Sequence, residues 1–247
     1  MSRLVASLQK RMDAFSLDVT FETDGAIAIV GPNGAGKSTT LLALLGLVKP
    51  DAGRISVGDD ILFDSERRID LPTEDRAFAF VPQDYGLFPH LSAAQNVAFA
   101  LACRPRPLMA SARPREALAL LDRFGLASIA HRRPAELSGG ERQRIALARA
   151  LAQTPRGLLF DEPFAALDVS VRGEVRRFLR EQLAALGLPA IVVTHDRVDV
   201  EALGIPVLVL ERGHVVQQGT LDSLAAKPAT PYVAEFCGVR SRGEATR

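Results

Sequence analysis

A glycine-rich loop near the N-terminus constrains the fold of this chain more than any other stretch of its sequence. The loop consists of Gly31, Pro32, Asn33, Gly34, Ala35, Gly36, Lys37, Ser38 and Thr39. It fits the pattern G-x-x-x-x-G-K-[S/T]. The apolar run Ala26–Val30 before it predicts a buried strand, and the apolar density of Thr39–Leu47 predicts a helix after it. This strand–loop–helix order argues against a glycine-rich turn without a ligand and indicates a site for a nucleoside triphosphate.

The loop suits phosphate because its glycines allow successive backbone N–H groups to point at phosphate oxygens. The helix that follows adds the positive end of its dipole. We expect the Lys37 ammonium to reach the β- and γ-phosphates and the Ser38 hydroxyl to bind Mg²⁺. Kinases, GTPases and ATPases all use such a loop, so the loop alone leaves the reaction open.

Further apolar runs alternate with helical patterns, which predicts an α/β fold around a largely parallel sheet. Buried strands are expected at Gly157–Phe160, Ala190–Thr194 and Val207–Leu210. The first of these runs leads into Asp161 and Glu162, and the second leads into His195. Open α/β sheets bind ligands at the carboxyl ends of their strands. We therefore expect these polar side chains at the ligand-binding edge of the sheet.

Two regions depart from this alternation. Apolar residues alternate with polar ones at residues 17–21 and 54–57, which predicts a small antiparallel β layer in the N-terminal part. Residues 91–151 are helical in pattern and predict a helical lobe inserted between two strands. We expect one domain over residues 1–238 and a flexible tail over residues 239–247.

The charge balance and the cysteines limit the classes of function. Among 247 residues, 30 Lys and Arg face 29 Asp and Glu, a net charge of +1. Nucleic-acid binders normally carry a basic excess, so no nucleic-acid partner is expected. Cys103 and Cys237 predict neither a disulfide scaffold nor a zinc site and fit a reducing cytosol. No secretory segment and no apolar run near the roughly 20 residues of a membrane span are found, so a membrane role requires another subunit.

The acidic pair Asp161-Glu162 indicates a second functional element. An apolar strand that ends in two acids is typical of a Walker B element, in which Asp161 would hold Mg²⁺. The Glu162 carboxylate, on the other face of the strand end, would polarise the attacking water. The alternative is a strand followed by an exposed acidic turn, and a further motif decides between the two.

The string Leu137-Ser138-Gly139-Gly140-Glu141-Arg142-Gln143-Arg144 makes the sequence recognisable. It resembles the signature of ATP-binding cassette (ABC) ATPases, and the resemblance covers nearly the whole chain. The family's motifs occur in the family's order. They are the P-loop at residues 31–39, a Q-loop at Val81-Pro82-Gln83, the signature, the Walker B strand, a D-loop at Ala166-Leu167-Asp168 and an H-loop at Val193-Thr194-His195-Asp196. The resemblance implies a P-loop NTPase core of the RecA-like type.

This resemblance also implies the roles of the site residues. The catalytic residues would be Glu162, His195, Gln83 and Lys37. The Mg²⁺ ligands would be Ser38, Gln83 and Asp161. The signature and D-loop contacts, made to ATP bound by a second copy of the chain, would be Ser138, Gly139, Gly140 and Asp168. ATP and Mg²⁺ are thus the implied cofactors, and hydrolysis is expected to need a head-to-tail dimer. Adenine is expected to stack on Phe15 or to be held by apolar contacts alone.

Both transporter motors and soluble ABC proteins that act on DNA or ribosomes use such a cassette. Soluble relatives usually carry two cassettes or a long coiled-coil insert, whereas this chain has one cassette with a compact lobe. We therefore expect the ATPase subunit of an ABC transporter. It would work with separate transmembrane permease subunits, in the cytoplasm at the inner face of the cell membrane.

Two stretches resemble importer cassettes in particular. In Gln83–Ser92, the apolar residues Phe88, Pro89 and Leu91 are expected to form a groove for a permease helix, with ordinary lobe–core packing as the alternative. The run Ile69–Arg76 resembles molybdate importer ATPases most, and sulfate, polyamine, iron and sugar remain alternative cargoes. Such relatives usually append a small β domain, which is not expected here because the sequence ends at residue 247.

Overall fold

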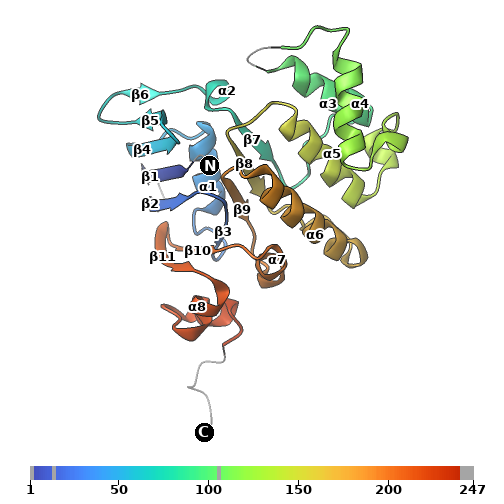
Figure 1. The fold of residues 1–247 in the computed structure, drawn as a ribbon. Helices are drawn as coiled ribbons and strands as arrows, with labels where there is room; N and C mark the ends of the chain where they lie inside the picture. Colours follow the sequence, from blue (N-terminus) through green and yellow to red (C-terminus); the bar gives the residue numbers. More distant parts are fainter. Residues whose placement is uncertain (1–2, 13–14, 105–106, 240–247) are drawn as a thin grey trace.

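One sheet runs through the computed structural model, which describes residues 3–12, 15–104 and 107–239 (Figure 1). Its strands are β1 (Leu4–Arg11), β2 (Ser16–Thr23), β3 (Ala26–Val30), β4 (Ala52–Val57), β5 (Asp60–Asp64), β6 (Ile69–Asp70), β7 (Phe78–Val81), β8 (Gly157–Asp161), β9 (Ala190–Val193), β10 (Val207–Glu211) and β11 (His214–Gly219). Their order across the sheet is β6-β5-β4-β1-β2-β11-β10-β3-β9-β8-β7. The predicted tail lies, except for Val239, outside the described residues.

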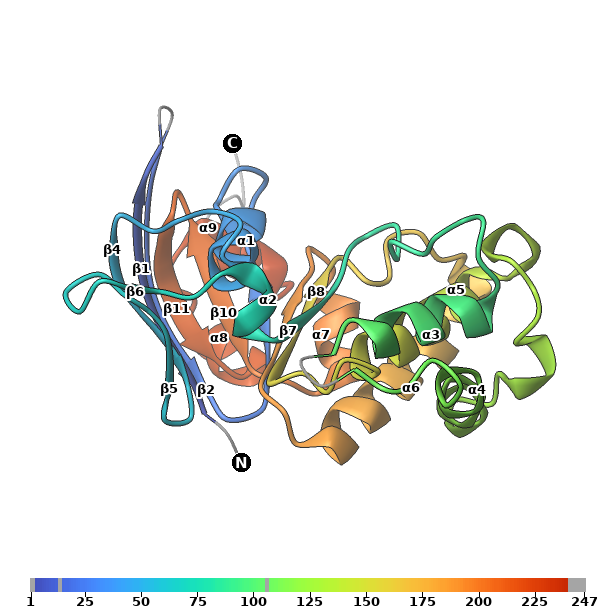
Figure 2. The same cartoon turned by 90° about the horizontal axis from the view of Figure 1, so that it is seen from above.

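The helices gather on the faces of this sheet and in a lobe beside it (Figures 1 and 2). They are α1 (Lys37–Leu45), α2 (Thr73–Arg76), α3 (Ala93–Ala102), α4 (Arg113–Arg123), α5 (Gly139–Leu151), α6 (Val169–Leu186), α7 (Arg197–Leu203), α8 (Leu221–Ala226) and α9 (Pro231–Phe236). Within the described ranges, no helix combines the length and the apolar composition that crossing a bilayer requires.

The predicted parallel sheet is confirmed in the half formed by β10, β3, β9, β8 and β7, which all pair in parallel with one another, whereas β10 pairs antiparallel with β11 on its other side. Both faces of these strands are covered, as is usual for parallel sheets. On β8, Leu159 packs into the cluster that contains Leu41 of α1. Leu158 points to the opposite face, into the cluster that contains Ile145 of α5 and Leu179 of α6. The nucleotide-loop helix and the two long helices therefore cover opposite faces.

The predicted antiparallel β layer is also confirmed, and it continues the same sheet. Strands β1 and β2 pair antiparallel from Leu4↔Thr23 to Arg11↔Ser16, and β4 to β6 extend this half. Along β2 every second side chain is buried, as the alternating pattern predicts. The two halves meet where β2 and β11 pair at Asp18↔His214.

Element boundaries differ from the predictions by one or two residues. The first helix covers Lys37–Leu45 instead of Thr39–Leu47. It ends early because Gly46 adopts a left-handed φ of 83° and its N–H closes the helix onto Ala43 O. Strand β8 continues to Asp161, and β9 ends at Val193, so Thr194 already belongs to the following loop.

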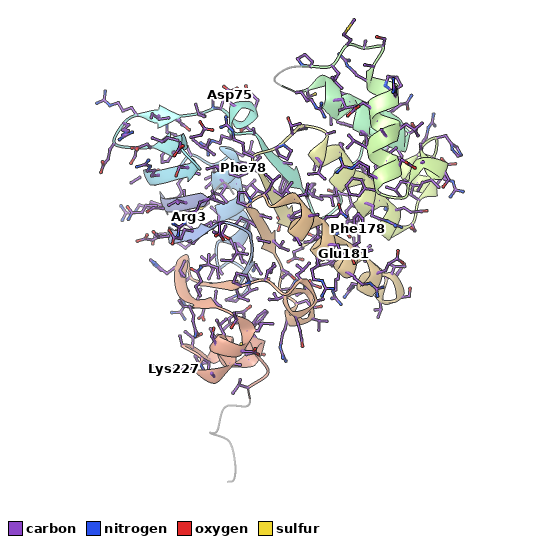
Figure 3. All side chains as sticks on the ribbon, in the orientation of Figure 1. Arg3, Asp75, Phe78, Phe178, Glu181 and Lys227 are labelled. Atoms are coloured by element: carbon purple, nitrogen blue, oxygen red, sulfur yellow. The ribbon has the colours of Figure 1, made fainter. Side chains whose placement is uncertain are left out.

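The predicted helical lobe consists of α3, α4 and α5 with two short 3₁₀ turns, Ala127–Ile129 and Pro134–Glu136. Helix α6 joins it to the sheet. Phe178 on α6 lies where this helix meets the lobe (Figure 3). Its ring packs edge-on against Phe124 at a centroid distance of 5.5 Å. The lobe therefore shares its apolar core with one face of the sheet.

A fully buried arginine ties the end of α1 to the neighbouring loop. Arg76 is 0% exposed, and burial lowers its pKa from the usual value. Its Nη1 donates to the carbonyls of Ala43 and Leu44 at 2.7 and 3.0 Å. Its Nε donates to Leu71 O at 2.9 Å, and its Nη2 donates to Asp70 Oδ1 at 2.9 Å. The guanidinium thus gives Ala43 O a second donor beside the Gly46 N–H, supplies a donor to Leu44 O, and carries a favourable charge at this end of the helix.

Replacing Arg76 with methionine is expected to lower the free energy of unfolding by about 3 kcal/mol. The methionine leaves buried carbonyls without a donor, and each such loss costs about 1–3 kcal/mol. Urea denaturation measures the change. Arg54→Met, at an exposed position of β4, serves as the matched control and should stay within about 0.5 kcal/mol of wild type. Equal stability of the two variants would contradict this role of Arg76.

Candidate functional site

The glycine-rich loop leaves β3 and enters α1 in a conformation that its glycines permit. Gly34 and Gly36 have φ angles of 77° and 103°, in the left-handed region that favours glycine. At Gly36 a Cβ atom would also lie 2.7 Å from Leu17 Cδ1, so a larger residue would be strained and would displace the Leu17 side chain. The loop therefore curls closely over the end of the β layer and into the first turn of α1.

Lys37 folds back over this loop. Its Nζ donates to Gly31 O at 2.7 Å and to Pro32 O at 3.0 Å, and the residue is 8% exposed. Burial lowers the pKa of the ammonium, while the charges of Glu162 and Asp161 oppose that shift. The cation is thus held inside the ring of loop carbonyls and amides, close to two carboxylates.

A cavity of about 220 Å³ opens beside this loop. It is lined by Phe15, Asn33, Gly34, Ala35, Gly36, Lys37, Ser38, Thr39, Glu162 and Val193. Phe15 is half-buried and its ring lies near Gly36, so the structure brings the expected aromatic side chain to the loop. Val193, the last residue of β9 and the first residue of the predicted H-loop, also lines the cavity, although no contact with the nucleotide was predicted for it.

Asp161 at the end of β8 faces the loop from the neighbouring segment. The Ser38 hydroxyl donates to Asp161 Oδ2 at 3.4 Å. Burial and then the nearby charge of Glu162 raise the pKa of the Asp161 carboxyl. A hydroxyl and a carboxylate are hard oxygen donors, and a divalent cation between them would offset both causes of that shift. The pair therefore fits Mg²⁺.

Glu162 and His195 form a second pair, which we call the acid–imidazole pair. His195 Nδ1 lies 3.1 Å from Glu162 Oε1. Glu162 has a φ of 45°, which non-glycine residues rarely adopt, and its N–H donates to Val193 O at 2.9 Å. Strained backbone of this kind concentrates at functional sites, where the surrounding structure must hold it.

Gln83 lies at the same edge of the sheet but outside the cavity. It follows β7, which pairs in parallel with β8, and its side chain is exposed. The described residues that line the cavity do not include it. The loop behind Gln83 is held from the lobe by Arg149, which donates to Gly86 O at 2.5 Å and to Tyr85 O at 3.3 Å.

The signature residues begin helix α5. Ser138 is the N-cap: its Oγ accepts from Glu141 N–H at 3.3 Å, and Glu141 Oε2 accepts from Ser138 N–H at 2.7 Å. A Cβ atom on Gly139 would lie 2.7 Å from Leu167 Cδ2, so the D-loop packs directly on the signature. Gly140 is buried, and Asp168 is exposed at the N-terminal end of α6.

The site is therefore divided into two groups within one chain. The structure brings Lys37, Ser38, Asp161 and the acid–imidazole pair together beside the cavity. It places Ser138 and Asp168 at the N-terminal ends of α5 and α6. Both views show α1 against the sheet and α5 in the lobe (Figures 1 and 2). Each group presents helix N-terminal amides that suit phosphate, at α1 and at α5.

The fold and this site define a P-loop nucleotide-binding protein. The family model described as ABC transporter matches residues 15–165. This chain belongs to the ABC transporter family.

Its relatives include named import proteins. The molybdenum import ATP-binding protein of Mycobacterium tuberculosis is 42% identical over 228 residues, 90% of this chain and 62% of that protein. The sulfate/thiosulfate import ATP-binding protein of Brucella melitensis is 42% identical over 244 residues, 96% of this chain and 66% of that protein. The chain thus spans less than two thirds of the molybdenum protein. A probable sulfate/thiosulfate import ATP-binding protein of Chlorella vulgaris is 38% identical, covering 97% of this chain and 100% of that protein.

A solved structure has the same fold. It is the dimeric post-hydrolysis state of the ATP-binding cassette MJ0796 bound to ADP and Pi. The two chains align with a TM-score of 0.69 and 29% identity, over 89% of this chain and 98% of the other.

Proposed function

We propose that this chain hydrolyses ATP with Mg²⁺ and powers import through separate membrane permease subunits. The observation that carries the proposal is the division of phosphate-binding groups between the cavity at α1 and the signature end of α5. A head-to-tail pair of copies would place the signature of one copy against the cavity of the other. The dimeric state of the neighbour MJ0796 and the import proteins among the relatives support this reading.

In the proposed reaction, positioning and neutralisation of charge do most of the work. The amides of the loop and the Lys37 ammonium would hold the β- and γ-phosphates. Ser38 and Asp161 would hold Mg²⁺, which when bound neutralises phosphate charge. Gln83 would complete the metal site after its loop moves inward, because its side chain now lies outside the cavity.

Glu162 would orient the attacking water and accept its proton. Its other partner is the His195 ring, whose Nδ1 faces the carboxylate at 3.1 Å and leaves Nε2 directed away from the pair. That second nitrogen would contact the γ-phosphate. Ser138 and the amides of Gly139 and Gly140 would neutralise the same phosphate from the second copy, and Asp168 would contact that copy across the interface.

We place the chain at the inner face of the cell membrane, bound to its permease. Molybdate is the cargo that we favour. Sulfate is the alternative, because import proteins of both kinds match this chain at 42% identity. A soluble role on ribosomes or DNA is the less favoured alternative.

Co-purification separates these alternatives. A tagged Glu162→Gln variant would be extracted from its source cells in mild detergent, with ATP present, and its companions identified by mass spectrometry. A multi-pass membrane protein is the expected companion, and the ligand of the binding protein that serves it identifies the cargo. Ribosomal proteins or DNA-repair factors without a permease would overturn the transport proposal and leave ATP hydrolysis standing.

An aromatic patch on the lobe is the proposed docking surface for the permease. Phe99 on α3 is 49% exposed, and its ring meets Phe88 edge-on at a centroid distance of 4.9 Å. Phe88 is half-buried, with the guanidinium of Arg149 5.5 Å from its ring centroid. Pro89 is exposed and Leu91 is half-buried, so part of the predicted loop packs on the lobe. Apolar patches of this kind mark interfaces.

Replacing Phe99 with aspartate is expected to weaken binding to the permease by about 2 kcal/mol, roughly 30-fold, as for an aromatic interface anchor. Basal ATP hydrolysis should stay within about twofold, because Phe99 lies on the lobe surface. Pull-down with the permease and phosphate release measure the two effects. Leu47→Asp, at a 61% exposed position after α1, is the control. Equal permease binding by both variants would remove this patch from the interface.

A further inference from the structure

The side chain of Arg176 on α6 joins two carboxylates and an aromatic ring. It is 11% exposed. Its Nε donates to Asp199 Oδ1 at 2.7 Å, and its Nη2 donates to Asp196 Oδ2 at 3.1 Å. The guanidinium carbon lies 5.8 Å from the centroid of the Phe164 ring, within the range of a cation–π contact. A planar guanidinium can serve all three partners at once.

In the sequence, these partners lie close to both members of the acid–imidazole pair. Asp196 directly follows His195, and Phe164 lies two residues beyond the glutamate of the pair. Asp199 accepts a hydrogen bond from the Thr194 hydroxyl at 2.6 Å, and Thr194 Oγ1 accepts one from Asp196 N–H at 3.1 Å. One arginine therefore ties residues 194–199, which are the loop after β9 and the first turn of α7, to the segment behind the Walker B strand.

His195 has little other support. Its side chain is 63% exposed, and in the described part of the chain its one side-chain hydrogen bond is to the glutamate of the pair. Asp199 is 5% exposed. Loss of the guanidinium would leave this buried carboxylate without its cation and beside the Asp196 carboxylate. We expect residues 194–199, which include His195, to shift when this cation no longer holds the two carboxylates.

We propose that Arg176 is a positioning residue for ATP hydrolysis, which fixes residues 194–199 and thereby holds the His195 imidazole against Glu162. The inference rests on the hydrolytic role proposed above for the acid–imidazole pair. Arg176 acts through this pair. It contacts residues next to the pair in the sequence, and none of these contacted residues lines the cavity.

Steady-state hydrolysis by Arg176→Met tests the proposal. We expect kcat to fall about 10- to 100-fold, because a misplacement of about 1 Å at a reacting centre costs up to roughly 100-fold. The KM for ATP and the directly measured ATP affinity should change less than about twofold, since the loop 31–39 is untouched. Arg176→Lys should recover part of kcat, because an ammonium cannot bridge both carboxylates as a planar fork does. Arg180→Met, at an exposed position of the same helix, should resemble wild type.

A double-mutant cycle with His195→Ala gives the readout that a purely structural role would not produce. The double variant should hydrolyse ATP as slowly as His195→Ala alone, because the two residues act as one unit. If Arg176→Met unfolds, Arg176→Lys carries the same cycle. Losses that multiply, or a fall in ATP affinity that matches the fall in kcat, would overturn the inference.

The cycle also separates this inference from the proposed function. A slow His195→Ala variant beside a wild-type Arg176→Met variant overturns the inference alone. A His195→Ala variant with wild-type turnover overturns the role proposed for the acid–imidazole pair, and the inference with it.

Discussion

Replacing Glu162 with glutamine is expected to lower ATP turnover by about 1,000-fold, within the roughly 100- to 10,000-fold range that a general base contributes. Glutamine has the shape of glutamate, and its amide can accept from or donate to His195 Nδ1, so the 3.1 Å contact can persist in either tautomer. It lacks the basic carboxylate that would take the proton of the attacking water. The variant should therefore bind ATP without cleaving it, which phosphate release and equilibrium ATP binding measure separately.

The same variant should accumulate as an ATP-bound dimer. With ATP and Mg²⁺, size-exclusion chromatography is expected to show twice the mass of the nucleotide-free chain, because the bound γ-phosphate keeps the two signatures closed. Glu181→Gln, at an exposed position on α6, is the control and should turn over ATP at the wild-type rate (Figure 3). Wild-type turnover by Glu162→Gln would exclude it as the base. Tight ATP binding by a variant that stays monomeric would contradict the two-copy site.

The place and conformation of the glycine-rich loop could be predicted from sequence because their determinants are local. The spacing of Gly31, Gly36 and Lys37 fixes where the backbone curls, and the apolar run before them can only be a buried strand. The same holds for the acidic end of β8 and for His195 after β9. Strands that are parallel and adjacent bring their carboxyl ends together, so the edge of the sheet on which these residues meet also follows from the pattern.

Three arginines that hold separate segments together could not be predicted, because most of their partners lie far away in the chain. In the sequence, Arg76, Arg149 and Arg176 look like solvated charges, as most arginines are. In the structure their guanidinium groups are satisfied by carbonyls or carboxylates of other segments. Arg149, for example, reaches a carbonyl 63 residues away. No periodicity reports a contact of this kind, since it depends on how α5 and the loop behind β7 pack.

Two further features could not be predicted from the sequence: the pairing of strands that lie far apart in the chain, and the direction of exposed side chains. The join of the two halves of the sheet, Asp18↔His214, connects the second strand with the last one. The resemblance predicted that Gln83 is a metal ligand. Its position after β7 was enough to predict that it lies at the same edge of the sheet as Asp161. The direction of an exposed side chain on a loop is not encoded in that place, so its role as a ligand stays a prediction.

Replacing Lys37 with alanine is expected to have the largest effect of any single change, a loss of about 10,000-fold in kcat/KM. One part is ground-state affinity, because a hydrogen bond to a charged group contributes about 1.5–3 kcal/mol, roughly 10- to 150-fold. The other part is stabilisation of the transferring phosphate, since removal of one preorganised donor lowers kcat by about 100- to 1,000-fold. Lys37 is placed for both effects: it is 8% exposed, and its Nζ already lies against the carbonyls of the loop at 2.7 and 3.0 Å.

Thermal or chemical unfolding with and without ATP separates this loss from damage to the fold. Wild type should be stabilised by about 2.7 kcal/mol at an ATP concentration 100 times its Kd. Lys37→Ala should lose most of that increment. Its stability without nucleotide should fall by only about 1–3 kcal/mol, because Gly31 O and Pro32 O lose their donor while the alanine still suits the first turn of α1. Lys227→Ala, at an exposed position after α8, should keep the full increment and full turnover (Figure 3). Wild-type hydrolysis by Lys37→Ala would refute the assignment of this loop as the phosphate site, and with it the reading of the cavity that the loop lines.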